Sequence, residues 1–156
     1  MKILAVDTAT EACSAALYID GEIRERYEIA PRRHAQLLLP MIDSLMAEAE
    51  LKPQQLDAIA FGCGPGSFTG LRIATGVMQG IAYGADLPVV PVSTLAAISQ
   101  QCLQKTTHDT IFTAVDARMD EIYWAVYQRD AENVARLIGK EKVQSATEVD
   151  ALQLTG

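Results

Sequence analysis

Histidine and cysteine, the side chains that most often bind zinc, are scarce in this chain, whose 156 residues include two histidines and three cysteines. Cys13, Cys63 and Cys102 are odd in number and far apart, which fits reduced thiols better than a disulfide framework or a zinc site. Positive charge is also in short supply, because the formal net charge is −7. Phosphate contacts need a positive electrostatic field, so we do not expect this chain alone to bind nucleic acid tightly. The chain could still belong to a complex that binds RNA through another subunit.

Long apolar runs are absent too, and no segment approaches the roughly 20 apolar residues that span a bilayer. The first apolar run, residues 3–6, meets Asp7 too early to be the core of a signal peptide and instead predicts a strand. We therefore expect a cytoplasmic protein without a membrane segment. Apolar residues still make up 49% of the chain, which suits the core of one domain or of two small lobes.

Apolar periodicity predicts strands and helices along the first two thirds of the chain. Residues 12–19 and 23–29 are strand-like runs on either side of Asp20-Gly21, a dipeptide typical of two-residue hairpins. The helix that follows is predicted from apolar residues at helical spacing. In chain order, the expected elements are strands over residues 3–6, 12–19 and 23–29, a helix over 35–50, a strand over 59–63, a helix over 68–83, a strand over 89–92 and a helix over 94–103.

A short sequence repeat indicates a duplicated lobe. Ala114-Val115-Asp116 repeats Ala5-Val6-Asp7, and each run predicts a strand, a turn after the Asp and a second strand. We therefore predict a first lobe over residues 1–104 and the start of a second over 105–156, with a third strand over 134–138 and a helix that starts at Thr147 and includes Leu152. A second lobe built like the first requires more chain, so we expect this chain to be a fragment.

The predicted order βββαβα, given twice, is the architecture of the actin, Hsp70 and sugar-kinase superfamily, with ribonuclease H-like lobes. The expected fold class is therefore α/β, with two such lobes of which the second is incomplete. Nucleotide-binding members of this superfamily hold the nucleotide between the lobes, but the fold alone does not determine the activity.

Two turns of the first lobe are candidates for contact with a nucleotide or a phosphate. Asp7-Thr8-Ala9-Thr10 lies where nucleotide-binding members have a glycine, and the Cβ of Ala9 is expected to crowd a phosphate there. The glycine-rich turn before residue 68 leads into a helix that Ser67 or Thr69 would cap, with N–H groups that favour an anion. The alternatives are a capped hairpin turn, and a tight turn that packs the helix against the sheet. The candidate phosphate loop comprises Asp7, Thr8, Thr10, Gly64, Gly66 and Ser67.

The helix after the second turn carries Gly76, Gly80 and Gly84 at intervals of four residues, which places them on one face. Each interior glycine costs roughly 1 kcal/mol relative to alanine, so an isolated helix does not retain three of them without some compensation. Close packing of this face against the sheet of the same chain is one explanation. Close approach of a helix from another subunit is the other.

The sequence also allows two catalytic alternatives. A phosphotransferase of the same fold would need a working phosphate loop, against which Ala9 argues. A peptidase would use Cys63 with His34, but no group that orients His34 is evident, and a thiol at the end of an apolar strand is expected to be buried and inert.

Several motifs of this chain resemble those of the TsaB/YeaZ family. The most specific is Gly64-Pro65-Gly66-Ser67-Phe68-Thr69-Gly70-Leu71-Arg72, which is similar to the family's signature. Four other runs are similar to family segments: Ile3-Leu4-Ala5-Val6-Asp7-Thr8-Ala9-Thr10, Arg33-His34-Ala35, Val92-Ser93-Thr94-Leu95 and Asp116-Ala117-Arg118-Met119-Asp120-Glu121-Ile122-Tyr123. The resemblance covers the whole chain.

The resemblance implies an accessory subunit that is not itself catalytic. Proteins of this family pair with a homologous TsaD-like catalytic subunit and act with a TsaE-like ATPase. Together they transfer threonylcarbamoyl from its adenylate to N6 of adenosine 37 in tRNAs that read codons beginning with A, so tRNA is contacted through the complex. TsaD-like relatives bind a metal through two histidines where this chain has Thr94 and Ile98, which are not metal ligands. No intrinsic cofactor is therefore expected, with ATP or ADP only at the interface of the complex.

The resemblance also implies a homodimer in isolation and an interface on the two helices of the first lobe, which agrees with the glycine-faced helix. The interface residues expected on these helices are Arg33, His34, Leu38, Ile42, Leu45, Arg72, Ile73, Gly76, Val77, Gly80 and Gly84.

Overall fold

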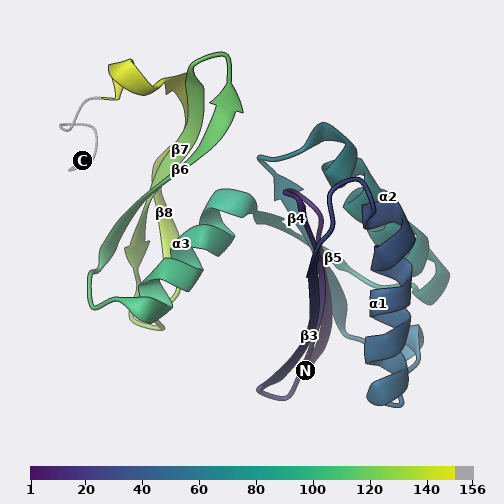
Figure 1. Ribbon diagram of the computed structural model, residues 1–156. Helices are drawn as coiled ribbons and strands as arrows, with labels where there is room; N and C mark the ends of the chain where they lie inside the picture. Colours follow the sequence, from purple (N-terminus) through teal and green to yellow (C-terminus); the bar gives the residue numbers. More distant parts are fainter. Residues whose placement is uncertain (150–156) are drawn as a thin grey trace. The chain divides into compact units, whose positions relative to one another are not determined.

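The computed structural model describes residues 1–149, which fall into two compact units, Met1–Val92 and a second that begins at Ser93. The first unit is a five-stranded sheet with two long helices, and the second is a three-stranded sheet with one helix (Figure 1). No helix of the described residues is long and apolar enough to cross a membrane.

The first unit confirms the predicted order of elements. Its strands are β1 (Lys2–Asp7), β2 (Ala12–Ile19), β3 (Glu22–Ile29), β4 (Ala58–Gly64) and β5 (Val89–Ser93), and its helices are α1 (His34–Glu48) and α2 (Phe68–Ala85), with a short 3-10 turn at Pro53–Gln55. The strand order is β3-β2-β1-β4-β5. β2 runs antiparallel to both β1 and β3, and β1 runs parallel to β4.

The turn between β2 and β3 shows why the sequence favours a hairpin there. Asp20 and Gly21 have φ angles of 48° and 105°, and only a few residue types adopt such positive φ angles without strain. The register is regular along the whole pair, from Ala12 opposite Ile29 to Ile19 opposite Glu22.

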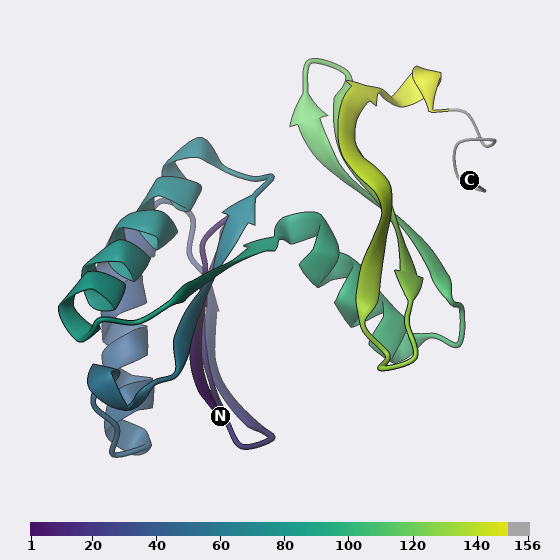
Figure 2. The ribbon, with the colours of Figure 1, turned by 180° about the vertical axis from the view of Figure 1, so that it is seen from behind.

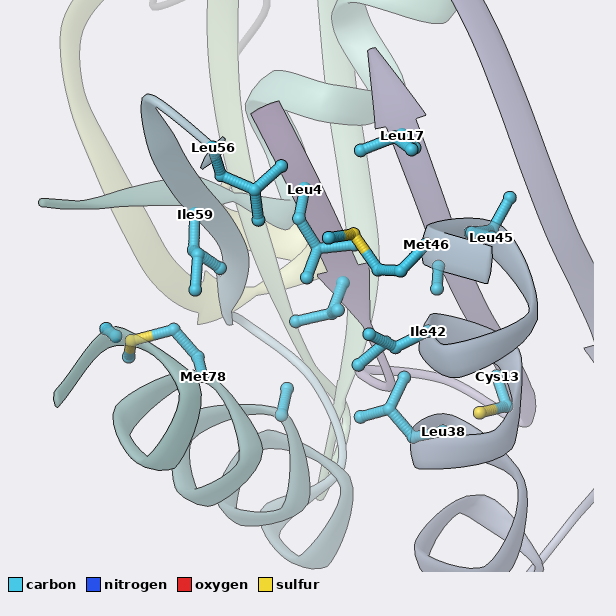
Figure 3. Packing of buried hydrophobic residues seen from close by; sticks show 14 residues of the cluster. Leu4, Cys13, Leu17, Leu38, Ile42, Leu45, Met46, Leu56, Ile59 and Met78 are labelled. Carbon is cyan, nitrogen blue, oxygen red and sulfur yellow. The ribbon is translucent and has the colours of Figure 1, made fainter. Parts of the chain in front are cut away.

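The core of the first unit lies between one face of its sheet and the two helices (Figure 3). Alternate residues of β1 and β2 point into it, as the two-residue period of a strand requires. Buried residues of α1 and α2 approach from the other side. The core residues labelled in Figure 3 are Leu4, Cys13, Leu17, Leu38, Ile42, Leu45, Met46, Leu56, Ile59 and Met78.

The second unit contains α3 (Thr94–Lys105) and an antiparallel sheet of β6 (Thr110–Arg118), β7 (Glu121–Arg129) and β8 (Ala135–Ser145). The sequence placed α3 in the first lobe, whereas its contacts place it here. Leu95 packs with Ala125 and Tyr127 of β7, and the hydroxyls of Ser99 and Thr113 are hydrogen-bonded at 2.5 Å. The chain passes from β5 directly into α3 (Figure 2), so no linker composition marks the division between the units.

β8 is longer than the predicted strand over residues 134–138. Gly139 has a φ of 78°, and the pairing of β7 with β8 shifts register between Trp124 and Val126. This irregularity lets the strand continue past Gly139, beyond the predicted end at residue 138. Beyond β8, a 3-10 turn spans Ala146–Glu148 where a helix was predicted to start, and Leu152 lies outside the described residues.

Candidate functional site

The two turns that sequence reasoning singled out lie against each other in the first unit. Residues 7–10 connect β1 to β2, residues 64–70 connect β4 to α2 and form its first turn, and we call the two segments the paired turns. The Thr8 hydroxyl donates a hydrogen bond to the Gly70 carbonyl at 2.7 Å, and the Ser67 N–H donates to the Ala9 carbonyl at 2.7 Å. Thr8 and Ala9 are buried, so the first turn fills the space beside the second.

Glycine is required in the paired turns because the two backbones approach so closely. A Cβ on Gly70 would lie 1.9 Å from the Thr8 carbonyl oxygen, and a Cβ on Gly66 would lie 2.5 Å from that of Ala9. Gly62, just before the second turn, faces the Asp7 carboxylate, and a Cβ there would lie 1.8 Å from Oδ2. These distances are far shorter than real contacts, so the glycines permit the packing of the helix start against β1 and β2.

Some polar groups in the first turn of α2 have partners within the chain. Ser67 is the N-cap, and its Oγ accepts a hydrogen bond from the Gly70 N–H at 3.3 Å, which identifies Ser67 rather than Thr69 as the cap. The guanidinium of Arg72 lies over the Phe68 ring, 3.3 Å from its centroid. A phosphate loop requires N–H groups directed at a ligand, and those of Ser67 and Gly70 already have partners.

The candidate phosphate-loop residues are therefore adjacent, but they differ in how exposed their polar groups are to a ligand. Thr8 is buried and bonded to Gly70, and Gly64 is buried. Thr10, Gly66 and Ser67 are exposed at the surface. Asp7 is partly buried, and its Oδ1 accepts a hydrogen bond from the Ala9 N–H at 2.9 Å. Burial raises the pKa of the Asp7 carboxyl, and this hydrogen bond offsets the rise only in part.

The cysteines are arranged differently from the prediction. Cys63 was expected to be buried, but it is exposed, whereas its neighbours in β4, Gly62 and Gly64, are buried. Cys13 is buried instead, and its sulfur lies 4.0 Å from the His34 carbonyl oxygen, to which the thiol donates. Burial raises the pKa of the Cys13 thiol, as do the nearby charges of Glu28 and Asp7, so this thiol is poorly suited to be a nucleophile.

Four residues assigned to a partner interface from the sequence are in the interior. Leu38, Ile42 and Leu45 belong to the core beneath α1 (Figure 3), and His34 is buried at the start of the same helix. Their helical spacing correctly predicted one face of α1, but that face packs on the sheet of its own chain. Their exposed fractions are 8% or less, which leaves little surface for contact with a partner. Ile73 and Val77 are partly buried against the same core.

The other predicted interface residues lie on the surface. Arg33, Arg72, Gly76, Gly80 and Gly84 are exposed. Three large apolar residues that sequence reasoning left out of the interface are exposed on the same two helices: Leu39 at 53%, Phe68 at 71% and Tyr83 at 93%. Tyr83 follows Gly80 by three residues and Gly76 by seven, so helical spacing alone places it near them. We call the exposed residues Arg33, Leu39, Phe68, Arg72, Gly76, Gly80, Tyr83 and Gly84 the α1–α2 outer surface.

α2 carries two lines of small residues with different uses. Gly70, Ala74 and Ala82 are buried together with Met78, which is the line that faces the sheet. Gly76, Gly80 and Gly84 form a second line that faces away from the core. No other part of the described chain lies within 4 Å of a Cβ built on any of them. Packing against the sheet of the same chain therefore does not explain these three glycines.

Known proteins are similar to this chain in sequence and in fold. A family model described as TsaD, tRNA N6-adenosine threonylcarbamoyltransferase, matches residues 26–155. The chain is 32% identical over 151 residues to the tRNA threonylcarbamoyladenosine biosynthesis protein TsaB of Buchnera aphidicola, covering 97% of this chain and 70% of that protein. The chain belongs to the TsaB/YeaZ family. This confirms the resemblance found in the sequence and, with it, the predicted fold class.

Other relatives agree with this membership. TsaB of Escherichia coli is 47% identical over 134 residues, which cover 86% of this chain and 58% of that protein. The chain thus spans little more than half the length of this relative. The solved structure of YeaZ from Pseudomonas aeruginosa superposes with a TM-score of 0.90 at 47% identity, covering 96% of this chain and 70% of that one.

The close approach within the paired turns makes a prediction about two glycines of one helix. Gly70→Ala forces a Cβ against the Thr8 carbonyl, so we expect a loss of about 3 kcal/mol in the free energy of unfolding. The matched control is Gly76→Ala, whose Cβ meets no other part of the described residues. This substitution should stabilise the protein by about 0.5–1 kcal/mol. Urea unfolding measures both. Equal effects of the two substitutions would show that the packing at Gly70 is not tight.

Burial of Asp7 predicts how stability depends on pH. Between the ordinary pKa of 3.8 and the raised one, the folded state binds more protons than the unfolded state, so the free energy of unfolding falls as pH rises. Asp7→Asn keeps an acceptor for the Ala9 N–H but carries no charge. We expect the variant to gain stability over the wild type at neutral pH, and the gain to shrink as pH falls through the raised pKa toward the ordinary one. Urea unfolding across this pH range tests this, and a variant less stable than wild type at neutral pH would contradict it.

Proposed function

We propose that this protein is a cytoplasmic accessory subunit for the synthesis of threonylcarbamoyladenosine in tRNA. It pairs with a TsaD-like catalytic subunit and acts with a TsaE-like ATPase. The complex transfers threonylcarbamoyl from its adenylate to N6 of adenosine 37 in tRNAs that read codons beginning with A. The names of its relatives, which describe biosynthesis of this modified nucleoside, support the proposal.

The single observation that carries the proposal is the outward line of glycines on α2. Three interior glycines destabilise an exposed helix by about 1 kcal/mol each relative to alanine, and they have no packing partner within the described chain. A helix of another subunit can approach such a surface closely, and Tyr83, three residues after Gly80 on the same helix, is 93% exposed. In isolation, two copies of this chain would pair through the same α1–α2 outer surface.

Two residues of α3 support a catalytic site in the partner subunit rather than in this chain. Thr94 and Ile98 stand on α3 where the resemblance expects the metal-binding histidines of the catalytic relative, and neither side chain suits a metal. The net charge of −7 favours contact of the tRNA with other subunits. The paired turns leave few groups of this chain available to a nucleotide, so we place ATP or ADP at the interface of the complex rather than in this chain alone.

A reconstituted modification assay tests the proposal. With purified TsaD-like and TsaE-like proteins, tRNA and threonylcarbamoyl-adenylate, we expect modification only when this protein is added, and none from this protein alone. Gly80→Leu should lower the modification rate at least tenfold, because the new side chain blocks close approach of the partner helix. Gln101→Leu, which introduces the same residue at an exposed position of α3, is the control and should leave the rate unchanged. Full modification without this protein would refute the accessory role. Full modification with the Gly80→Leu variant would refute the interface.

A further inference from the structure

Arg72 is the one charged residue of α2, which contains no acidic side chain. It is exposed, and it precedes Gly76 by four residues, so the outward line of glycines continues through Arg72 for one further helical turn. A partner helix that packs along the whole of this line therefore meets the Arg72 side chain at one end of the contact. Close approach along the glycines and recognition of a positive charge are combined on one face of α2.

The Arg72 side chain is held in place by Phe68, one turn earlier in the helix. The Cζ atom of the guanidinium lies 3.3 Å from the centroid of the Phe68 ring. Nη1 donates a hydrogen bond to the Phe68 carbonyl oxygen at 3.2 Å. An arginine that is already stacked on an aromatic ring loses less conformational freedom on binding than a mobile one. The stack therefore orients Arg72 for a contact at the surface.

One edge of the Arg72 guanidinium has no acceptor among the described residues. The single hydrogen bond of the side chain uses Nη1, and no ion pair of the described residues includes Arg72. The remaining edge, formed by Nε and Nη2, is a fork whose N–H groups match the two oxygens of a carboxylate. A partner that covers this edge without supplying an acceptor would bury an uncompensated charge, which opposes association.

The surroundings of Arg72 favour a protein carboxylate as this acceptor. Arg72 follows the first turn of α2, where the positive end of the helix dipole adds to the attraction for a negative group. The α2 helix of a second copy contains no carboxylate and would add another positive charge. The net charge of −7 disfavours a phosphate of tRNA. The catalytic partner is therefore the source of the carboxylate that these charges favour.

We propose that Arg72 is a specificity-determining residue of the α1–α2 outer surface, and that its Nε and Nη2 groups bind an Asp or Glu carboxylate on a helix of the catalytic partner. Phe68 is the positioning residue that orients the guanidinium. This inference rests on the proposed function, because it requires the partner to pack on α2. The glycines allow close approach of any helix, whereas Arg72 favours a helix that carries an acid at the matching position.

Calorimetric titration of this protein with the TsaD-like subunit, at several salt concentrations, tests the role of Arg72. We expect Arg72→Gln to raise the dissociation constant about tenfold or more, because it leaves the partner's carboxylate unpaired. Arg72→Lys keeps the charge but not the fork, so its dissociation constant should lie between the two. Salt should weaken binding of the wild type more steeply than binding of Arg72→Gln, because salt screens an ion pair. A purely structural role of Arg72 would not change this salt dependence.

Two further variants separate the charge of Arg72 from its orientation and from net charge. Phe68→Leu removes the ring but keeps Arg72, so we expect the dissociation constant to rise about threefold with the salt dependence retained. Lys105→Gln removes one positive charge from an exposed position of α3, and it should change neither the affinity nor the salt dependence. Circular dichroism of each variant confirms that the chain is folded.

Failure of this inference is distinguishable from failure of the proposed function. If Arg72→Gln binds the TsaD-like subunit as tightly as the wild type, or binds more weakly with an unchanged salt dependence, the role of Arg72 is wrong and the accessory function stands. If Arg72→Gln instead weakens only the binding of tRNA to the assembled complex, the acceptor is a phosphate and the proposal is also wrong. If the wild type does not bind the TsaD-like subunit, both proposals are refuted.

Discussion

The contact of Thr8 and Ala9 with the start of α2 is the constraint on which the first unit depends. Two hydrogen bonds, from the Thr8 hydroxyl to Gly70 and from the Ser67 N–H to Ala9, hold the helix start to the turn that joins β1 and β2. The contact is feasible only because Gly66 and Gly70 present no side chain to those carbonyls. It fixes where α2 begins and therefore which of its faces meets the sheet.

Once α2 is fixed in this way, its two lines of small residues are assigned different roles. Ala74, Met78 and Ala82 join the core, while Gly76, Gly80 and Gly84 face outward without a packing partner in the described chain. The three outward glycines cost about 3 kcal/mol in total relative to alanine, a sizeable share of the roughly 5–15 kcal/mol that stabilises a typical domain. A selected function at this surface explains their presence better than stability does.

Much of the fold followed from local sequence patterns. Strand periodicity and Asp20-Gly21 predicted the first hairpin, and the strands and helices of the first unit were predicted in the right order because each has a clear periodic or turn signal. α3 was assigned to the wrong unit, since its packing on Ala125 and Tyr127 is a tertiary contact that periodicity does not encode. The end of β8 was missed because the strand continues to Ser145 through an irregular pairing with β7, which a sequence pattern does not reveal.

The candidate site was less predictable than the fold. The glycines of the paired turns predicted a phosphate loop, and no sequence pattern reveals that Gly66 lies against Ala9 and Gly70 against Thr8. The spacing of Leu38, Ile42 and Leu45 identified a helix face, but spacing alone does not say whether a face meets the core or a partner. Tyr83 was overlooked although its spacing from the glycines places it beside them.

The central claim is that the α1–α2 outer surface binds the catalytic subunit while the paired turns maintain the fold. Amide hydrogen exchange of this protein, with and without a TsaD-like subunit, tests it most directly. We predict that added protection is concentrated in α1 and α2 around Leu39, Gly76, Gly80 and Tyr83. Protection of other segments with no change in these two helices would contradict the account.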